Sequence, residues 1–367
     1  MPKAIAIESF ALISPLGANP EETWRAIHAG RRLADRGIIS EPTFNQIASD
    51  VPSEIKNLDR SIVLAWAACT QAISRAGWRQ DQLRDPDTAL FMATSKGPVL
   101  AVLSGCEVLH KSGPAGLSEQ LAEEIALGPG AAGTLVAWAL GVGGPIHTSV
   151  AACAGSLAAV HLACRALMTG QCRRAIIAAT DASVHPMFEN SFNNLGVLPS
   201  PAADARRYCE PFTAGGGGFF ITEGAAALCL SLSENPRLRV EKTWLGGDAT
   251  HLIATDPAGR SLSRGLKFCS QGFGVDFVHA HATGTEHDKF ELAAIQRICG
   301  TQVNVFSHKF WMGHTLGASG LMALVLSAMC HLQGATLGGA KLDAKTRSIT
   351  VAQGFGGHIG VCALASG

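Results

Sequence analysis

The sequence has few charged residues and no excess of either sign. Only 16% of its 367 residues are Asp, Glu, Lys or Arg, and 29 basic residues balance 29 acidic ones, so the formal net charge is zero. A chain without a basic excess lacks the general attraction to phosphate on which nucleic-acid and anionic-membrane binding depend. Hydrophobic residues make up 47% of the chain and 41 residues are glycine, which excludes a disordered protein. We therefore expect one large or two fused globular domains that bind no nucleic acid.

Paired cysteines and a secretory leader are also missing. The 11 cysteines are scattered singly without a Cys-x-x-Cys pair, and the N-terminal segment MPKAIAIESF does not have the pattern of a signal peptide. No His-Glu-x-x-His motif is present either. These absences predict a cytoplasmic protein with reduced thiols and without a bound metal.

Charge is absent altogether between Ile125 and Cys164. The segments GPGAAG and GVGGP break this run into pieces that are too short to cross a membrane, so we predict no membrane span. An uncharged run of this length is hard to keep soluble unless it is buried. We expect it to form core and, around Gly144 to Val150, a dimer interface.

The remaining sequence alternates between strand-like and helix-like segments, which favours an α/β fold with a mainly parallel sheet. The second half also repeats the first. The helical segment GSLAAVHLACRALMTG (155–170) aligns without a gap to SGLMALVLSAMCHLQG (319–334), and a weaker repeat pairs EGAAALCL with IGVCALA. Repetition of a loop, a helix and a strand in the same order indicates a duplicated unit. We place the two halves at 1–235 and 236–367.

The segment around Cys153 surrounds one thiol with very small side chains. Its neighbours from 151 to 156 are all Ala, Gly or Ser, and an apolar helical pattern follows. A helix N-terminus offers unpaired N–H groups and partial positive charge, which lower the pKa of a thiol and favour the reactive thiolate. The pattern is typical of a nucleophile on a strand-to-helix elbow. The alternative is one more small apolar core residue.

Two later segments supply histidine and lysine. VHAHATGTEHDKFE brings His281 to the C-terminal end of a predicted strand, where open α/β sheets place their ligands. SHKFWMGHTLGASG carries Lys309 and His314 in the loop before the repeated helix, so the duplication places His314 near the counterpart of Cys153. Each histidine alone is compatible with a structural role. Together with Cys153 they favour a cysteine–histidine site over a zinc site, for which no ligand spacing is present.

With these residues in place, the chain resembles the β-ketoacyl-acyl-carrier-protein synthases, the elongating condensing enzymes of the thiolase fold. The resemblance runs nearly end to end. Six segments carry it in the family's order: AIAIESFALISPLGANPEETWRAIHAGRR, GPIHTSVAACAGS, EPFTAGGGGFFITEGAAALCL, HAHATGTEHDKFE, KFWMGHTLGASG and GFGGH.

The resemblance implies a thiolase fold, in which duplicated α/β halves form a five-layer αβαβα sandwich. It implies that Cys153 accepts the acyl group and that His281 and His314 are the two active-site histidines. Its further assignments are supporting roles for Lys309 and Glu223, a gate at Phe355 whose N–H forms the oxyanion hole with that of Cys153, and an acyl-pocket position for Phe192.

The implied reaction is the decarboxylating condensation of a cysteine-bound acyl group with malonyl-acyl-carrier protein, giving a 3-oxoacyl-carrier in fatty acid, polyketide or polyene synthesis. The enzyme is then an acyltransferase that uses no cofactor and no metal. Its partners are acyl carrier proteins with acyl and malonyl groups, and a second synthase chain in a homodimer or heterodimer.

The chain departs from the family pattern in several places. Ala151 and Ala282 stand where Thr and Gly are usual, His279 replaces Asn, and His358 begins the segment that replaces Thr-Asn. The run TAGGGG (213–218) replaces charged residues that include an Arg-Asp pair. These departures leave Cys153, His281 and His314 in place. They bear on which substrate is used and on whether the protein is active without a second synthase chain.

Two alternatives remain open at this stage. A chain-length-determining partner subunit of a heterodimeric synthase usually lacks the cysteine, whereas Cys153 is present. A biosynthetic thiolase would use a second cysteine near the C-terminus, and Cys362 is the candidate, although it lies within an apolar strand pattern.

Overall fold

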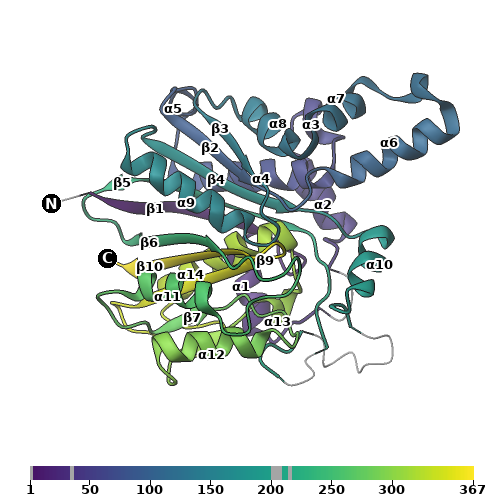
Figure 1. The fold of residues 1–367 in the computed structure, drawn as a ribbon. Coiled ribbons are helices and arrows are strands. Elements are labelled where there is room, and N and C mark those ends of the chain that lie inside the picture. Colours follow the sequence, from purple (N-terminus) through teal and green to yellow (C-terminus); the bar gives the residue numbers. More distant parts are fainter. Residues whose placement is uncertain (1–2, 34–36, 200–208, 214–216) are drawn as a thin grey trace.

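A computed structural model describes residues 3–33, 37–199, 209–213 and 217–367 (Figure 1). Ten strands form one hydrogen-bonded sheet in the order β3-β2-β4-β5-β1-β6-β10-β9-β7-β8. The strands are β1 Ala4–Ile13, β2 Thr88–Ala93, β3 Ile146–Ser149, β4 Arg174–Asp181, β5 Gly224–Ser233, β6 Leu238–Gly247, β7 Phe277–His279, β8 Asn304–Phe306, β9 Arg347–Gly354 and β10 His358–Ser366. The helices are α1 Pro20–His28, α2 Glu41–Ala48, α3 Ser53–Lys56, α4 Arg60–Ala76, α5 Gln80–Leu83, α6 Val99–Ser112, α7 Glu119–Leu127, α8 Ala131–Leu140, α9 Gly155–Met168, α10 Pro186–Asn194, α11 Arg260–Ser270, α12 Asp288–Cys299, α13 Lys309–Met312 and α14 Ser319–Gln333.

The sheet is built from two equivalent sets of five strands. The order β3-β2-β4-β5-β1 in the first half is matched by β8-β7-β9-β10-β6 in the second, and the halves meet where β1 pairs with β6. The duplicated α/β architecture predicted from the repeated segments is therefore confirmed, with α9 and α14 as the matching helices. Since β5 ends at Ser233 and β6 begins at Leu238, we keep residue 235 as the proposed division.

Alternation of side chains along the strands divides the core into layers. In β1, Phe10 and Leu12 contact the central cluster with α9 and α14, whereas Ala11 and Ile13 face the outer cluster with α4 and α8. Helices α11 and α12 cover the outer face of the second half. Two helical layers therefore cover the outer faces of the two five-stranded parts, and a third helical layer lies between them (Figure 1). This is the arrangement of a five-layer sandwich.

The prediction of a mainly parallel sheet is wrong. The pairs β2–β3, β2–β4, β7–β8 and β7–β9 are parallel, but all the central pairs, from β4–β5 through β1–β6 to β10–β9, are antiparallel. The reason is visible at β9 and β10, which are joined by the tight turn Phe355–Gly357: a short turn can connect only antiparallel neighbours. Alternation of strand and helix in the sequence does not reveal such hairpins.

The backbone itself repeats at the entry to each central helix. Ala152 has φ +47° and lies three residues before α9, while Leu316 has φ +44° and lies three residues before α14. Residues with a side chain rarely adopt this left-handed conformation, so two such residues at matching positions mark a conserved bend rather than an accident of one loop. Strands β4 and β9 match as well, eight residues each, and they end at Asp181 and Gly354.

One stretch, Leu316–Gln333, is long and apolar enough to cross a membrane by length and composition, and 83% of it is buried inside the fold. It contains α14, the central helix of the second half. Its apolar character therefore matches a core position between the two parts of the sheet.

Candidate active site

Cys153 lies in a strained elbow between β3 and α9. The strand ends at Ser149, the helix begins at Gly155, and Ala152 adopts its left-handed conformation directly before the cysteine. The end of β9 packs tightly against this elbow: a Cβ on Gly354 would lie 3.0 Å from the backbone N of Cys153 and 2.9 Å from the carbonyl oxygen of Ala151. Only glycine at 354 lets the strand approach Cys153 so closely.

A cavity of about 190 Å³ opens at the cysteine and brings most of the predicted residues together. Its polar lining includes Cys153, His281 and His314, and the apolar part includes Phe192 and Phe355. A larger surface hollow of about 680 Å³ lies over Ser14–Ala18 and α1, and none of the predicted site residues line it.

The rings of His281 and His314 contact each other edge-on in the cavity wall. Their centroids are 5.3 Å apart with an angle of 76° between the planes, and the ring of Phe219 packs edge-on to His314 at 4.9 Å. Burial, reinforced by the nearby Lys309 ammonium, lowers the pKa of both histidines well below the ordinary value. Both imidazoles are therefore neutral, and each has one N–H to donate. The Nδ1 atom of His314 is buried and has no hydrogen-bond partner within the described residues.

Acidic residues of α12 hold the His281 loop through its backbone. The Glu291 carboxylate accepts from the N–H groups of His281 (2.7 Å) and Ala282 (2.8 Å), and Asp288 accepts from those of Thr283 and Gly284 (2.9 Å each). Hydrogen bonds to four consecutive backbone donors fix the loop, and with it the direction of the His281 ring. In the sequence these are the Asp and Glu that follow the histidine motif.

Lys309 and Glu223 are buried but lie outside the cavity lining. The Lys309 ammonium donates to the carbonyl oxygen of His281, so it fixes that residue and places a positive charge behind it. Glu223 accepts from the backbone N–H of Ile39 (2.9 Å) and pairs with Arg60 (2.6 Å). It follows Thr222, whose backbone N–H donates to the carbonyl oxygen of His314.

The predicted lowering of the Cys153 pKa is wrong. Burial raises the pKa of this thiol to about 11, although the ammonium groups of Lys96 and Lys309 act in the opposite direction. The sequence reveals the helix that follows the cysteine but not how far the elbow is enclosed by β9 and the cavity walls, and enclosure outweighs the nearby positive charge. At neutral pH this thiol is therefore protonated.

A buried pair of histidines behind the cavity was not anticipated. His279 Nε2 lies 2.9 Å from His308 Nδ1 and also accepts from the His308 backbone N–H, while His279 Nδ1 lies 3.1 Å from the Ser327 hydroxyl. The backbone donor makes Nε2 of His279 an acceptor, so its Nδ1 carries the proton and His308 donates through Nδ1. The pair ties β7 to the segment that begins α13 and to α14. The departure at 279 was visible in the sequence, but its partner, 29 residues away, was not.

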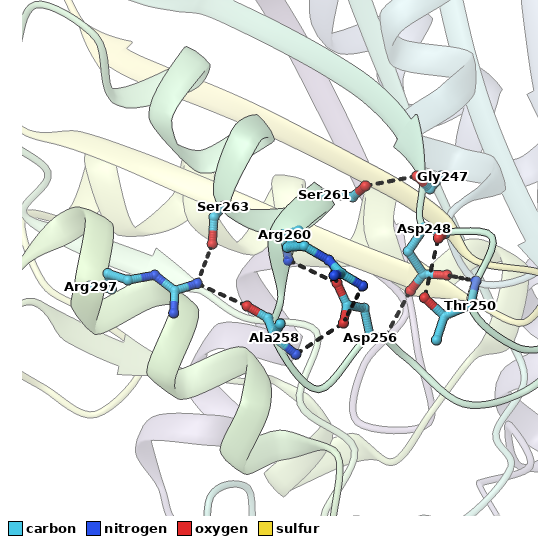
Figure 2. A network of polar contacts seen from close by, with 9 residues as sticks. All are labelled: Gly247, Asp248, Thr250, Asp256, Ala258, Arg260, Ser261, Ser263 and Arg297. Carbon is cyan, nitrogen blue, oxygen red and sulfur yellow. Dashed lines mark hydrogen bonds and ion pairs between the residues drawn. The ribbon is translucent and has the colours of Figure 1, made fainter.

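The loop between β6 and α11 forms the outer wall of the cavity through His251, Ile253 and Thr255. Figure 2 shows how two carboxylates shape it: Asp248 accepts from the backbone N–H groups of Thr250 and Asp256, and Asp256 accepts from Ala258 and Arg260. The loop also holds the turn after β9, because the Gly356 N–H donates to the Leu252 carbonyl oxygen (2.7 Å). These residues form no recognisable motif, so they could not be assigned to the site from the sequence.

Phe355 and Phe192 meet at the apolar side of the cavity. Their rings stack with centroids 6.0 Å apart and an interplanar angle of 28°, and Phe192 also contacts Phe219 edge-on at 6.0 Å. Of the glycine run TAGGGG, residues 214–216 lie outside the described residues. All 11 cysteines are free, and no group of three or more His, Cys, Asp or Glu within the described residues is arranged to hold a metal ion.

Comparison with known proteins shows the family to which the chain belongs. The sequence matches the family descriptions "Beta-ketoacyl synthase, N-terminal domain" over residues 40–235 and "Beta-ketoacyl synthase, C-terminal domain" over residues 241–337. It is 26% identical to 3-oxoacyl-[acyl-carrier-protein] synthase 2 of Rhizobium meliloti (strain 1021), over 89% of this chain and 86% of that protein.

Two solved structures share the fold over the full length of both chains, each with a TM-score of 0.85. One is the ishigamide ketosynthase/chain length factor, at 21% identity. The other is a type II polyketide synthase acyl-carrier protein in complex with its ketosynthase bound to the hexaketide, at 18% identity. The predicted thiolase fold and the predicted acyltransferase class are thus confirmed, and the chain belongs to the beta-ketoacyl synthase family.

Proposed function

We propose that the protein catalyses the decarboxylating Claisen condensation of an acyl group on Cys153 with malonyl-acyl-carrier protein, giving a 3-oxoacyl-carrier. One observation carries this proposal: the cysteine elbow and two neutral histidines line the same cavity. A thiol and two N–H donors are the groups that acyl transfer followed by decarboxylation requires. No redox step is involved, and we propose that no cofactor or metal takes part.

In the first half-reaction the Cys153 sulfur attacks the carbonyl carbon of an acyl-carrier thioester. The new C–S bond forms as the bond to the carrier sulfur breaks, and the thiol proton passes to the departing carrier thiolate. The developing oxyanion is stabilised by the backbone N–H groups of Cys153 and Phe355. The close approach of Gly354 to the Cys153 nitrogen supports this pairing, because it brings the end of β9 to the elbow.

In the second half-reaction the malonyl thioester loses CO2, and the electron pair of the broken C–C bond moves into the thioester as an enolate. The N–H groups of His281 and His314 donate to the enolate oxygen, which a charged imidazolium would hold too strongly for onward attack. The enolate carbon then attacks the acyl-cysteine carbonyl, a C–C bond forms, and the Cys153 thiolate leaves and takes up a proton from solvent.

The partners that fit this reaction are acyl carrier proteins with acyl and malonyl groups, and we place the enzyme in the cytoplasm. One structural neighbour is a ketosynthase in complex with its carrier protein, and another is a ketosynthase/chain length factor. A role as the partner subunit of a heterodimeric synthase is therefore the alternative to this proposal, and the presence of Cys153 favours the catalytic subunit. A thiolase role is disfavoured because Cys362 is buried within β10, away from the cavity.

A dimer is the expected state in solution. Strand β3 is the last strand at one end of the sheet, and large apolar side chains near it are exposed: Ile146 (45%), Val150 (51%) and Trp138 (60%). An open strand edge beside apolar side chains favours association. Light scattering at micromolar concentration should give twice the chain mass. A monomer would contradict this prediction, and a stable complex formed only with a homologous synthase chain would support the partner-subunit alternative.

Phe355 is expected to act as a gate between the half-reactions. Its ring covers the cavity at Phe192, and the glycines on both sides, of which Gly356 has φ +84° and Gly357 +77°, allow the backbone to move. Phe355→Ala should change the ratio of acyl loading to condensation, measured separately, with little change in melting temperature. If stability fell while both half-reaction rates stayed at the parent values, Phe355 would be a packing residue only.

The function itself is tested with purified protein, malonyl-carrier and a panel of acyl-carriers, each reaction followed by intact mass. The expected products are acyl-enzyme in the first step and a carrier lengthened by two carbons with a 3-oxo group in the second. Acyl-enzyme without a lengthened carrier would refute the condensation step. Absence of both products would refute the proposal and favour the partner-subunit alternative, which does not depend on acylation of Cys153.

A further inference from the structure

Lys96 is a half-buried cation beside the acyl side of the cavity. Its ammonium lies 5.3 Å from the ring centroid of Phe188 and 5.5 Å from that of Phe192, two residues one turn apart on α10. Phe192 lines the same cavity as Cys153. The cation is therefore one ring away from the space that an acyl chain on the cysteine would enter.

The backbone that carries Lys96 is held rigidly. The N–H of Gly97 donates to the Thr94 hydroxyl (3.0 Å), and Gly97 has φ +79° and would clash with Pro129 if it carried a Cβ. The neighbouring Ser95 is fixed by Asp181, which accepts from both its N–H and its hydroxyl. Lys96 is thus placed by its loop, and only the side chain is free to adjust.

The Lys96 ammonium has more hydrogen-bond donors than the protein uses. It has three N–H donors, and it donates to the Ser95 hydroxyl (2.9 Å). No carboxylate forms an ion pair with it within the described residues. The acid that binds Ser95, Asp181, also accepts from the Ser183 hydroxyl and the N–H of Gly317. A cation with spare donors against an otherwise apolar wall matches an oxygen acceptor better than a hydrocarbon.

The wall around it is aromatic. Phe192 connects Lys96 to Phe355 and Phe219, and Phe219 packs against His314. An acyl chain that extends from Cys153 along Phe192 comes toward the ammonium. A saturated chain has no atom that could accept from the ammonium, whereas a keto or hydroxyl oxygen on the chain would accept from it.

We propose that Lys96 makes this site selective for acyl groups that carry an oxygen along the chain, such as oxoacyl groups, over saturated acyl groups of the same length. The inference rests on the proposed function, because it requires Cys153 to be acylated. It concerns the acyl group and not the malonyl group, whose oxygen is bound by the two histidines.

The test measures acylation of Cys153 by intact mass with three N-acetylcysteamine thioesters: hexanoyl, 3-oxohexanoyl and 5-oxohexanoyl. A site that pairs with a substrate oxygen discriminates strongly against the analogue that lacks it, so the parent should prefer at least one oxo thioester by about 10-fold or more. Lys96→Met should abolish this preference by accelerating hexanoyl transfer or slowing oxoacyl transfer, and Lys96→Arg should retain it.

Lys242 supplies a matched control. Its ammonium is also half-buried and lies over a phenylalanine ring, 5.5 Å from the centroid of Phe268, and it donates to one oxygen, the carbonyl of Gln271. Unlike Phe192, however, Phe268 does not line the cavity. Lys242→Met should leave the preference unchanged. A preference that survives in Lys96→Met, no preference in the parent, or a rise in the malonyl KM as the main effect of Lys96→Met would each overturn the proposal. Failure of the parent to be acylated by any thioester would instead refute the proposed function.

Discussion

Cys153→Ala is expected to abolish acylation of the protein. After incubation with an acyl thioester the parent should gain one acyl group by intact mass, and the variant none, because the cavity contains this one cysteine. Cys164 and Cys362 are poor substitutes: they are 4% and 1% exposed, and burial raises the pKa of Cys164 to about 12. The loss should be complete within detection.

The melting temperature of Cys153→Ala is the control for this result. Alanine keeps the Cβ at position 153, so the elbow against Gly354 is unchanged, and the melting temperature of Cys153→Ala should stay close to that of the parent. Peptide mapping of the acylated parent should locate the group on Cys153. An adduct found on Cys164 or Cys362, or one that persists in the variant, would show that the nucleophile lies elsewhere.

His281→Ala and His314→Ala should separate the two half-reactions. Both variants are expected to accept an acyl group, because loading depends on the cysteine and the backbone donors, but to release CO2 from malonyl-carrier about 10²–10³ times more slowly, the usual effect of removing one oxyanion donor. Release of labelled CO2 measures this directly. Since both histidines act on one oxygen, the double variant should lose much less than the product of the two single effects.

The pH dependence gives an independent check of the same roles. The pKa of each histidine is lowered, so the neutral donor form exists above that low pKa and is lost only as the pH falls through it. Decarboxylation should therefore remain active at a pH where an ordinary histidine is already protonated. A histidine variant that decarboxylates at the parent rate would identify that residue as structural.

The sequence predicted well what is encoded locally. The small residues before α9, the histidine at the end of a strand and the repeated helix are all short-range patterns, and they identified the two halves and the residues that share the cavity. Features that depend on distant segments were predicted wrongly or missed. The antiparallel centre of the sheet depends on which strands become neighbours, and the raised pKa of Cys153 depends on its enclosure by β9. The His279–His308 pair and the position of Lys96 over α10 likewise join residues far apart in the chain.

The repeated elbow shows what distinguishes the two halves of the fold at the site of Cys153. In the second half the residue that corresponds to Cys153 is Gly317, and its N–H donates to the carboxylate of Asp181 at the end of β4. A Cβ there would lie 2.2 Å from the Ser95 nitrogen, so no nucleophile fits. In the first half the residue that corresponds to Asp181 is Gly354. One elbow thus holds a carboxylate against its backbone N–H, whereas the matching position of the other half carries no side chain. If Cys153 acts as proposed, the missing side chain at Gly354 is what leaves the Cys153 N–H to a substrate oxyanion, so Gly354 would matter to the reaction as much as the thiol does.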